Sequence, residues 1–133
     1  MQKTQHYILG QWVDGQGEGA PILDSVTGEH FTNVTTEGID APEVLQYGRV
    51  KGVALRKMTF QERGNMLKKL AFHLQKHKRS FYEISYRSGC TKIDSWIDIE
   101  GGAGTLLSTA SKAKRELPDD TIILDGAVEQ ISK

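Results

Sequence analysis

One stretch of the chain gathers several chemically active residue types. "YRSGCTKIDSWIDIEGG", residues 86–102, holds the single cysteine, Cys90, followed by Lys92 and three acids. A reactive thiol needs a lowered pKa, from a helix N-terminus or a nearby cation, and usually a general base within reach. Lys92 is near in sequence, and Cys90 falls between two expected helices. These features permit a catalytic thiol without indicating one, so we assign no catalytic residue.

The acids of this stretch, Asp94, Asp98 and Glu100, suggest paired carboxylates. Asp94 is better placed as the cap of a helix. Acidic residues in a first helical turn are favoured by the helix dipole without any catalysis. We therefore interpret these acids as the start of a helix.

The glycines that close the stretch, Gly101, Gly102 and Gly104, lie inside a helical pattern. Glycine costs about 1 kcal/mol relative to alanine in a helix interior, so their placement needs a reason. Close crossing of two helices is the structural explanation. The functional explanation is that a helix without side chains leaves room for a bulky ligand. A phosphate loop is excluded because the G-K-[ST] ending is absent.

"GQGEGA", residues 15–20, fits G-x-G-x-x-A directly after a predicted strand. A dinucleotide fingerprint must open into a helix whose amides hold the pyrophosphate. Here Pro21 and further strand-like and turn-like residues follow. We predict that Gly15, Gly17 and Gly19 form a hairpin loop, and we assign no cofactor-binding residue.

His73 and His77 are four residues apart on an expected helix, a spacing compatible with shared metal coordination. No acidic residue follows the first histidine, and the stretch is crowded with Lys68, Lys69, Lys76, Lys78 and Arg79. This pattern is typical of a solvated basic face. We assign no metal ligand.

The elements that must position these residues fall into three segments. Residues 1–39 are β-rich, with a strand over 7–13, another near 22–23 and a third at "HFTNV" after a turn at "TGE". Residues 40–117 are helical. Residues 118–133 begin a strand segment, because "TIILDG" is typical of a strand entering a turn.

Four helices are expected in the middle segment. "DAPE" puts Asp40 at the cap of a helix from Ala41 to about residue 56. "TFQE" begins the second helix with Thr59 and Glu62, and apolar residues recur after it at helical spacing. The third helix covers 80–89 and ends at Gly89, and the fourth runs from Asp94 to about residue 117.

Composition sets the broad class. The chain has 133 residues, of which 38% are hydrophobic and 26% charged, as expected for one modest domain or a piece of a larger one. Lys plus Arg and Asp plus Glu are both 17, so the basic excess of a nucleic-acid-binding protein is absent. No apolar run approaches the ~20 residues of a membrane span. We expect a cytoplasmic protein without nucleic-acid or membrane partners.

The order of these segments resembles the N-terminal region of the aldehyde dehydrogenase superfamily. "ILGQWVDGQG" is similar to that family's opening strand and turn. "DSVTGEHFTNV" resembles its P-x-T-G-E segment, with Ser25 and Val26 in place of the usual asparagine or aspartate and proline. "MTFQERGNMLKKLAFHLQKHKRSFYEISYRSG" resembles its paired helices. "DSWIDIEGGAGTLLSTASK" and "RELPDDT" resemble the branch of bifunctional phenylacetate-degradation proteins, whose dehydrogenase is fused to a C-terminal MaoC-like hydratase domain.

The resemblance implies an enzyme that oxidises an aldehyde with NAD or NADP. In that family a cysteine thiolate attacks the carbonyl, hydride passes to the nicotinamide, and a glutamate-activated water hydrolyses the thioester. The branch implies a CoA-linked semialdehyde as substrate and an α/β parent with a Rossmann-type cofactor domain. The family's catalytic and cofactor motifs lie downstream of these residues. We therefore expect the 133-residue chain to be inactive alone and to bind no cofactor.

The resemblance also implies where the three helical glycines lie in the enzyme. In the family, the helix matched by residues 94–117 borders the substrate entrance, and Gly101, Gly102 and Gly104 fall near its tunnel-facing part. We expect them to widen that entrance for a CoA thioester. The fragment itself should be α+β, with a small β-element, about four helices and a terminal strand. The alternative is a non-catalytic helical module for interaction or oligomerisation, and a homo-oligomer is expected through exposed helix faces.

Overall fold

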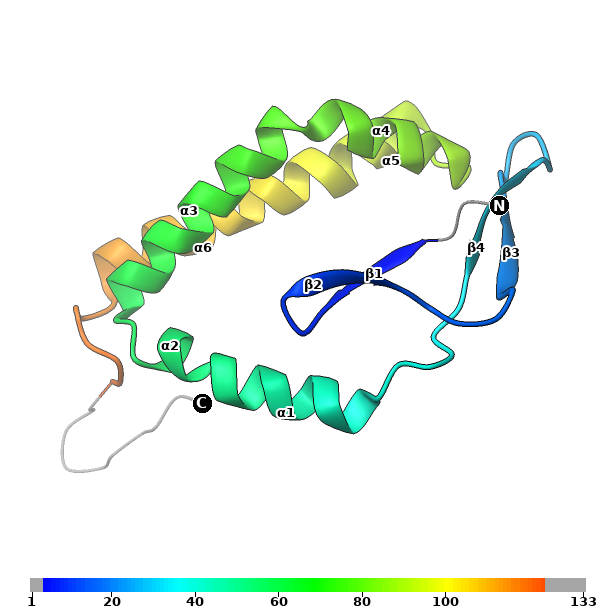
Figure 1. Cartoon of the computed structure of the whole chain (residues 1–133). Coiled ribbons are helices and arrows are strands. Elements are labelled where there is room, and N and C mark those ends of the chain that lie inside the picture. Colours follow the sequence, from blue (N-terminus) through cyan, green and yellow to red (C-terminus); the bar gives the residue numbers. More distant parts are fainter. Residues whose placement is uncertain (1–3, 124–133) are drawn as a thin grey trace. The chain divides into compact units, whose positions relative to one another are not determined.

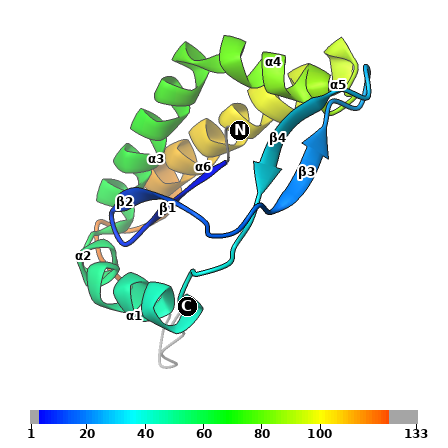
Figure 2. The same cartoon turned by 45° about the vertical axis from the view of Figure 1, so that its right-hand side comes forward.

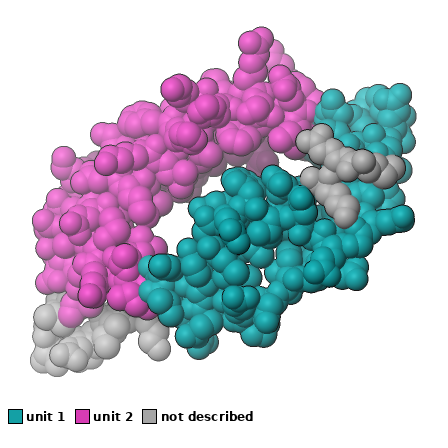
Figure 3. Space-filling view, in the orientation of Figure 1, with its two compact units in different colours: residues 1–52, 87–89 teal, residues 53–86, 90–133 magenta. Residues whose placement is uncertain are grey.

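The computed structural model describes residues 4–123, which form short antiparallel strands followed by helices (Figure 1). The chain divides into two compact units, coloured separately in Figure 3. The first comprises Met1–Gly52 and Arg87–Gly89. The second comprises Val53–Tyr86 and Cys90–Lys133.

The first unit begins with a tight hairpin of β1, Gln5–Ile8, and β2, Gln11–Asp14. Leu9 and Gly10 connect them with φ values of 53° and 84°. Positive φ at both central residues is the mark of a type I′ turn, which matches the twist of paired strands. The prediction of one strand over 7–13 is therefore wrong. Positive φ is uncommon for leucine, so of the pair Leu9 and Gly10 only the glycine indicated a turn in the sequence.

A second hairpin joins β3, Ala20–Leu23, to β4, His30–Val34. The Asp24 carboxylate holds the turn, because it accepts hydrogen bonds from the backbone amides of Val26 at 2.9 Å and Thr27 at 3.1 Å. These amides, together with the nearby Arg87 guanidinium, hold the pKa of Asp24 below its ordinary value against a smaller effect of desolvation. The two later strands and their turn are thus confirmed.

The glycines at 15–19 connect β2 to β3, which belong to different sheets. Gly17 and Gly19 have φ values of 69° and 75°. The prediction of a hairpin loop here is wrong, since the paired strands are β1 with β2 and β3 with β4. The sequence pattern showed a turn but carried no information on which strands would pair across it.

The first predicted helix is divided in two. α1, Ala41–Lys51, starts after Asp40, whose side chain accepts from the Glu43 amide at 3.1 Å. α2, Val53–Arg56, follows Gly52. The predicted cap is confirmed, but the continuous helix to residue 56 is wrong. Gly52 interrupts the pattern, which is consistent with the low helix propensity of glycine.

The second unit is built on two long helices, α3, Phe60–Lys76, and α6, Gly102–Glu116. They lie side by side and run in opposite directions (Figures 1 and 2). A capping box begins α3: the Thr59 hydroxyl accepts from the Glu62 amide, and the Glu62 carboxylate accepts from the Thr59 amide. This predicted start is confirmed.

Small residues line the seam between α3 and α6. A Cβ placed on Gly64 would lie 3.2 Å from both the Ala110 carbonyl oxygen and the Ala113 Cβ. The buried apolar side chains of the described residues are all alanines: Ala71, Ala103, Ala110 and Ala113. The helices therefore pack closely, but over a small apolar volume.

Three shorter helical segments complete this part of the chain: α4, Lys78–Arg87, α5, Lys92–Trp96, and the π-helical turn η1, Ile97–Gly101. The cap of α5 is Thr91, whose hydroxyl accepts from the Asp94 amide at 3.2 Å. The prediction that Asp94 is the cap is wrong by one turn. Both residues favour helix starts, and a local pattern cannot rank two such residues three positions apart.

The end of α6 agrees with the sequence, because Leu117 is extended and Pro118 follows. Residues 118–123 contain no strand, although "TIILDG" predicted one. Instead the Asp120 carbonyl accepts from the Phe60 amide at 2.9 Å, next to the start of α3. The remainder of the predicted strand segment, from residue 124, lies outside the described residues. Within residues 4–123, the helices are too short or too polar to cross a membrane.

Candidate functional site

The three glycines predicted at the substrate entrance lie together where η1 passes into α6. Gly101 is the last residue of the π-helical turn, and Gly102 and Gly104 belong to the first turn of α6. A Cβ placed on any of them meets no described atom within 4 Å. Close helix crossing therefore does not explain these glycines within residues 4–123. That role belongs to Gly64, which the sequence pattern did not single out.

The π-helical turn is itself unusual. A π-turn inserts one extra residue into a helix, and such turns are frequent at functional sites. The Thr105 hydroxyl donates to the Gly101 carbonyl at 3.0 Å and so satisfies one backbone acceptor at the junction. The helix is thus locally widened at this junction, and three of the residues there carry no side chain.

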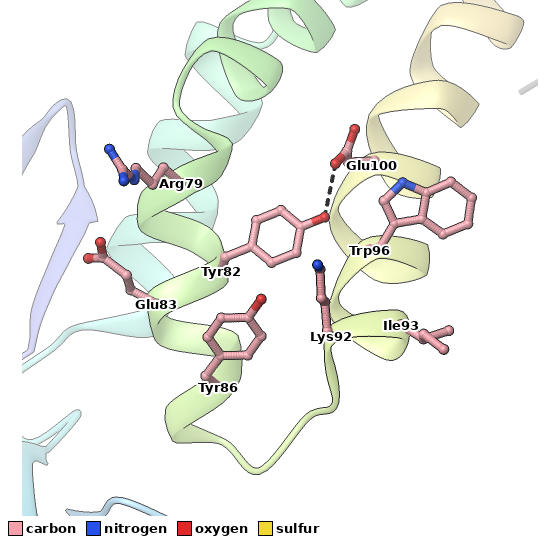
Figure 4. Close-up of a pocket in the computed structure, with 8 residues that line it drawn as sticks. All are labelled: Arg79, Tyr82, Glu83, Tyr86, Lys92, Ile93, Trp96 and Glu100. Atoms are coloured by element: carbon pink, nitrogen blue, oxygen red, sulfur yellow. Dashed lines mark hydrogen bonds between the residues drawn. The ribbon is translucent and has the colours of Figure 1, made fainter.

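A groove of about 740 Å³ lies beside this junction, between α4 and the segment formed by α5 and η1 (Figure 4). Each wall repeats at helical spacing, so each helix presents one face. The wall from α4 is Arg79, Tyr82, Glu83 and Tyr86; the wall from α5 and η1 is Lys92, Ile93, Trp96 and Glu100. The side chains of Tyr82 and Lys92 lie between the two helices in the close-up.

Glu100 joins the two walls. Its carboxylate accepts a hydrogen bond from the Tyr82 hydroxyl at 2.9 Å (Figure 4). It also accepts one from the Lys78 ammonium at 3.0 Å. Elsewhere along the same pair of helices, the Ser85 and Ser95 hydroxyls lie 2.9 Å apart and hydrogen-bond, and Ser95 is fully buried. The α4 to α5 pairing therefore depends on polar contacts rather than on a large apolar core.

The contacts of Glu100 with Lys78 and Tyr82, called the Glu100 brace below, change the acidity of its members. The hydrogen bond from Lys78, followed by that from Tyr82, holds the pKa of Glu100 below its ordinary value. Desolvation, followed by the hydrogen bond to Glu100, raises the pKa of Tyr82. Both shifts favour the arrangement of a charged carboxylate and a neutral phenol. This arrangement joins α4 to η1 and so has a structural role.

Cys90 follows a helix end rather than a reactive site. Gly89 has a φ of 85°, and the Cys90 amide donates to the Ser85 carbonyl at 3.2 Å. This bond, six residues in span, is the signature of a Schellman cap on α4. The prediction that Gly89 stops the helix is confirmed. The backbone of Cys90 thus has a structural role.

The other predicted candidates do not come together. The rings of His73 and His77 are tilted by 41° to each other, with centroids 4.6 Å apart. No group of three His, Cys, Asp or Glu residues within 4–123 could hold a metal ion. Asp94 accepts from the Thr91 hydroxyl at 2.6 Å, whereas Glu100 belongs to the brace. Their separate partners argue against a catalytic carboxylate pair.

The glycine-rich segment at 15–19 does not fit a dinucleotide-binding loop. The segment at 15–19 leads into β3 instead of a helix, so it lacks the N-terminal amides that hold a pyrophosphate. A Cβ on Gly19 would lie 2.5 Å from the Val34 carbonyl oxygen, and Gly15 is similarly close to Thr35. These glycines accommodate backbone of the same chain, which leaves no cradle for a cofactor.

Two features of the site were not predicted: the shared helix face of Lys78 and Tyr82, and their contact with Glu100. Lys78 and Tyr82 are four apart on α4, a spacing that places them on one helix face. Their shared partner Glu100 follows 18 residues after Tyr82. Spacing alone could have paired the first two residues, but nothing in it indicated Glu100.

No family model matches the chain. Among curated proteins, the chain is 39% identical over 114 residues to the 3,4-dehydroadipyl-CoA semialdehyde dehydrogenase of Aromatoleum evansii. The match covers 84% of this chain and 22% of that protein. The chain therefore spans about a fifth of the length of the curated relative it matches.

Proposed function

We propose that this chain is the N-terminal part of an NAD(P)-dependent aldehyde dehydrogenase that oxidises a CoA-linked semialdehyde to the carboxylic acid. The observation that carries this proposal is the 39% identity, over 114 residues, to a dehydrogenase named for a CoA-linked semialdehyde. The substrate belongs to aromatic catabolism of the phenylacetate type, as the sequence resemblance implies.

In this proposal the chain contributes structure rather than chemistry. The catalytic cysteine, the general-base glutamate and the cofactor site belong to other parts of an α/β enzyme. Two observations support this division of roles. The segment at 15–19 does not fit a dinucleotide, and Cys90 serves a helix cap through its backbone. The 133-residue chain alone is inactive.

The first experiment tests the enzyme. The longest natural reading frame that contains these residues is expressed and supplied with a CoA-linked semialdehyde and NAD or NADP. We expect aldehyde-dependent absorbance at 340 nm from the reduced cofactor. A folded product without activity on any aldehyde, or a natural stop directly after Lys133, would contradict the proposal.

The glycines at the start of α6 widen the entrance for the CoA thioester. Their open surroundings support this role, since a side chain at Gly101 or Gly104 would extend into space that no described residue fills. In the complete enzyme, leucines at both positions should lower activity on CoA-linked aldehydes and spare activity on small aldehydes.

Gly48 provides the matched control, because it is also helical and a Cβ placed on it meets no described atom within 4 Å. Gly48→Leu should leave both activities unchanged. Equal loss on both classes of aldehyde in the Gly101 and Gly104 variant would remove the entrance role while leaving the dehydrogenase assignment intact.

A second candidate function is favoured by one observation. The largest fully buried side chain of the described residues is Ser95, and many large apolar side chains are exposed. Such a surface suits a helical module for interaction or oligomerisation without catalysis. Any aldehyde-dependent formation of NADH or NADPH by the 133-residue chain itself would exclude this candidate and would also contradict the expected inactivity.

A further inference from the structure

The segments α5, η1 and α6 follow one another without a gap over residues 92–116. The residues that border η1 keep right-handed helical dihedral angles: Ile97 has φ −60° and ψ −46°, and Gly102 has φ −58° and ψ −48°. The π-turn is therefore one extra residue within a continuous helix rather than a break. Such a residue rotates the helix after it by about 100° about its axis, because 3.6 residues make one turn.

The buried residues of this helix show why an extra residue is needed. Ser95, Ala103 and Ala110 are 0%, 3% and 7% exposed, and together they are called the buried stripe below. Ala103 and Ala110 are seven residues apart and so share one helix face. Ser95 precedes Ala103 by eight residues and would lie about 80° from it in a regular helix. One extra residue between them reduces the effective spacing to seven and makes the stripe continuous.

The Glu100 brace determines where in that interval the extra residue lies. Ser95 contacts α4 through the Ser85 hydroxyl at 2.9 Å, and Glu100 contacts the same helix through the brace (Figure 4). Ser95 and Glu100 are five residues apart, which would place them about 140° from each other in a regular helix. Because both contact α4, the extra residue lies between them and precedes the glycines.

Without the brace, the buried stripe would be equally continuous with the extra residue after Glu100. Gly101 and Gly102 follow directly, and glycine has the backbone freedom and the low helix propensity that such a change needs. An extra residue there would rotate Gly101 by about 100° relative to α6. The hydrogen bond from the Thr105 hydroxyl to the Gly101 carbonyl spans four residues, as in a regular helix, and would be lost.

We propose that Lys78 and Tyr82 are positioning residues for the substrate entrance. By holding Glu100, they keep the extra residue ahead of Gly101 and so fix the direction in which the entrance glycines face. They act through Glu100 rather than through contact with the substrate. The register of the helix is a property of the chain itself, whereas its role at the entrance rests on the proposed function.

The first experiment measures the register in the 133-residue chain by two-dimensional amide NMR. Lys78→Met combined with Tyr82→Phe removes both donors of the brace and keeps most of the volume of each side chain. We expect the amide signals of Gly101 and Gly102 to shift or split in this double variant, whereas Gly48, on α1, keeps its signal. Unchanged signals of Gly101 and Gly102 overturn the proposal.

Two further variants control for the loss of a lysine. Lys78→Arg keeps a charged donor and should give the parental glycine signals. Lys69→Met removes an exposed lysine of α3, outside the brace, and should also leave them unchanged. Glycine signals that move as far in Lys69→Met as in the double variant overturn the proposal, because they would show a general effect of charge.

A deletion tests the register while the brace is kept, and so covers loss of folding in the double variant. Deletion of Asp98, an exposed residue of η1, leaves Ser95 and Glu100 four residues apart, which is the spacing of one face of a regular helix. We expect this deletion to keep the helicity and the thermal midpoint of the chain. Deletion of Thr109, an exposed residue of α6, is the matched control and should lower the midpoint, because it rotates Ala110 off the buried stripe. Equal midpoints for the two deletions, or a lower midpoint for the deletion of Asp98, overturn the proposal.

The last experiment measures the entrance in the complete enzyme. The double variant should raise KM for a CoA-linked aldehyde by about tenfold, within the factor of about 100 that a misplacement of about 1 Å can cost. It should leave kcat, and the activity on small aldehydes, unchanged. Lys78→Arg and Lys69→Met should both keep the parental KM.

The outcomes separate this inference from the proposed function. An unchanged KM in a double variant whose glycine signals have moved overturns the positioning role and leaves the dehydrogenase assignment intact. Equal loss of activity on small and CoA-linked aldehydes overturns it as well. A complete enzyme without activity on any aldehyde overturns the dehydrogenase assignment and the positioning role together, and the glycine signals then report the register alone.

Discussion

Glycines show how differently one residue type can act at the scale of a single position. Gly64 sits where α3 and α6 approach each other, and its missing Cβ permits the contact with Ala110 and Ala113. Gly104, also inside a helix, faces no described atom. Gly89 is required for a third reason, its left-handed backbone. The same residue thus serves packing, openness and a helix stop.

Substitutions at Gly64 and Gly104 should change stability in opposite directions. Gly104→Ala should raise the free energy of unfolding by about 0.5 to 1 kcal/mol, because alanine favours the helix and meets nothing. Gly64→Leu should lower it by about 1 to 3 kcal/mol through overpacking against α6. Urea unfolding followed by circular dichroism compares both with the unchanged chain. A stabilised Gly64→Leu would show that the seam is looser than described.

Cys90 should tolerate replacement. Its amide closes the cap of α4, and alanine keeps that amide, so Cys90→Ala should leave the activity of the proposed full-length enzyme nearly intact. Gly89→Ala is the informative contrast, since a φ of 85° is strained for alanine and should cost about 1 kcal/mol. Steady-state assays and thermal unfolding separate the two effects. A large loss of turnover in Cys90→Ala would restore the catalytic interpretation of the thiol.

At the scale of elements, polar contacts define the ends and pairings of the helices. The capping box of α3 and the Thr91 cap of α5 satisfy backbone amides that the helix starts leave unpaired. The Glu100 brace joins side chains of α4 to η1. These contacts matter more than usual here, because the apolar seam consists of alanines.

The cap of α3 gives a direct test. Thr59→Ala removes the side-chain acceptor of the Glu62 amide and should lower the free energy of unfolding by about 1 kcal/mol. Thr109→Ala on α6 is the control, because Thr109 is exposed and caps no helix. The two variants are compared by thermal unfolding, followed by circular dichroism at 222 nm. The cap affects the signal of roughly one helical turn. Equal midpoints would show that the cap contributes nothing to stability.

The Glu100 brace should weaken at both extremes of pH. Hydrogen bonds from Lys78 and Tyr82 lower the pKa of Glu100, so its contribution is complete at neutral pH and is lost as the pH falls through that lowered value. The pKa of Tyr82 is raised by desolvation and by Glu100, so its contribution is lost as the pH rises through that raised value.

Glu100→Gln should bring the ionisation of Tyr82 back towards its ordinary range, because the negative charge and its hydrogen bond disappear. Absorbance of tyrosinate at 295 nm, with Tyr82→Phe to identify the signal, measures this change. An unchanged titration in Glu100→Gln would mean that the brace does not form in solution.

At the scale of the whole molecule, the described residues lack a large apolar core. Ser95 is the largest fully buried side chain, and the exposed large hydrophobic residues include Leu45, Ile93 and Trp96. A chain of 133 residues would ordinarily bury roughly two thirds of the surface of its unfolded state. Further segments of a longer enzyme would cover this exposed apolar surface, and so would a second copy of the chain. Both are therefore candidates for the partner of this surface.

Unfolding of the isolated chain should therefore be weakly cooperative. The urea dependence of its stability should fall below the ~1 to 3 kcal/mol per molar of small two-state proteins, because little apolar surface becomes newly exposed. Coincident, steep transitions by fluorescence and circular dichroism at low concentration would contradict this. Transitions that sharpen as the concentration rises would instead support association.

Local chemistry in the sequence was enough to determine the starts of α1 and α3 and the second hairpin. It also determined that Gly89 stops α4 and that α6 ends before Pro118. Each depends on residues within a few positions of one another, such as a cap and the amide it accepts from. Only tertiary structure decided that Gly64 is the packed glycine, that Glu100 joins α4 to η1, and that the loop at 15–19 links two sheets. Those outcomes depend on pairs of residues brought together across many positions, and spacing along the chain does not encode which distant atoms will fill the same space.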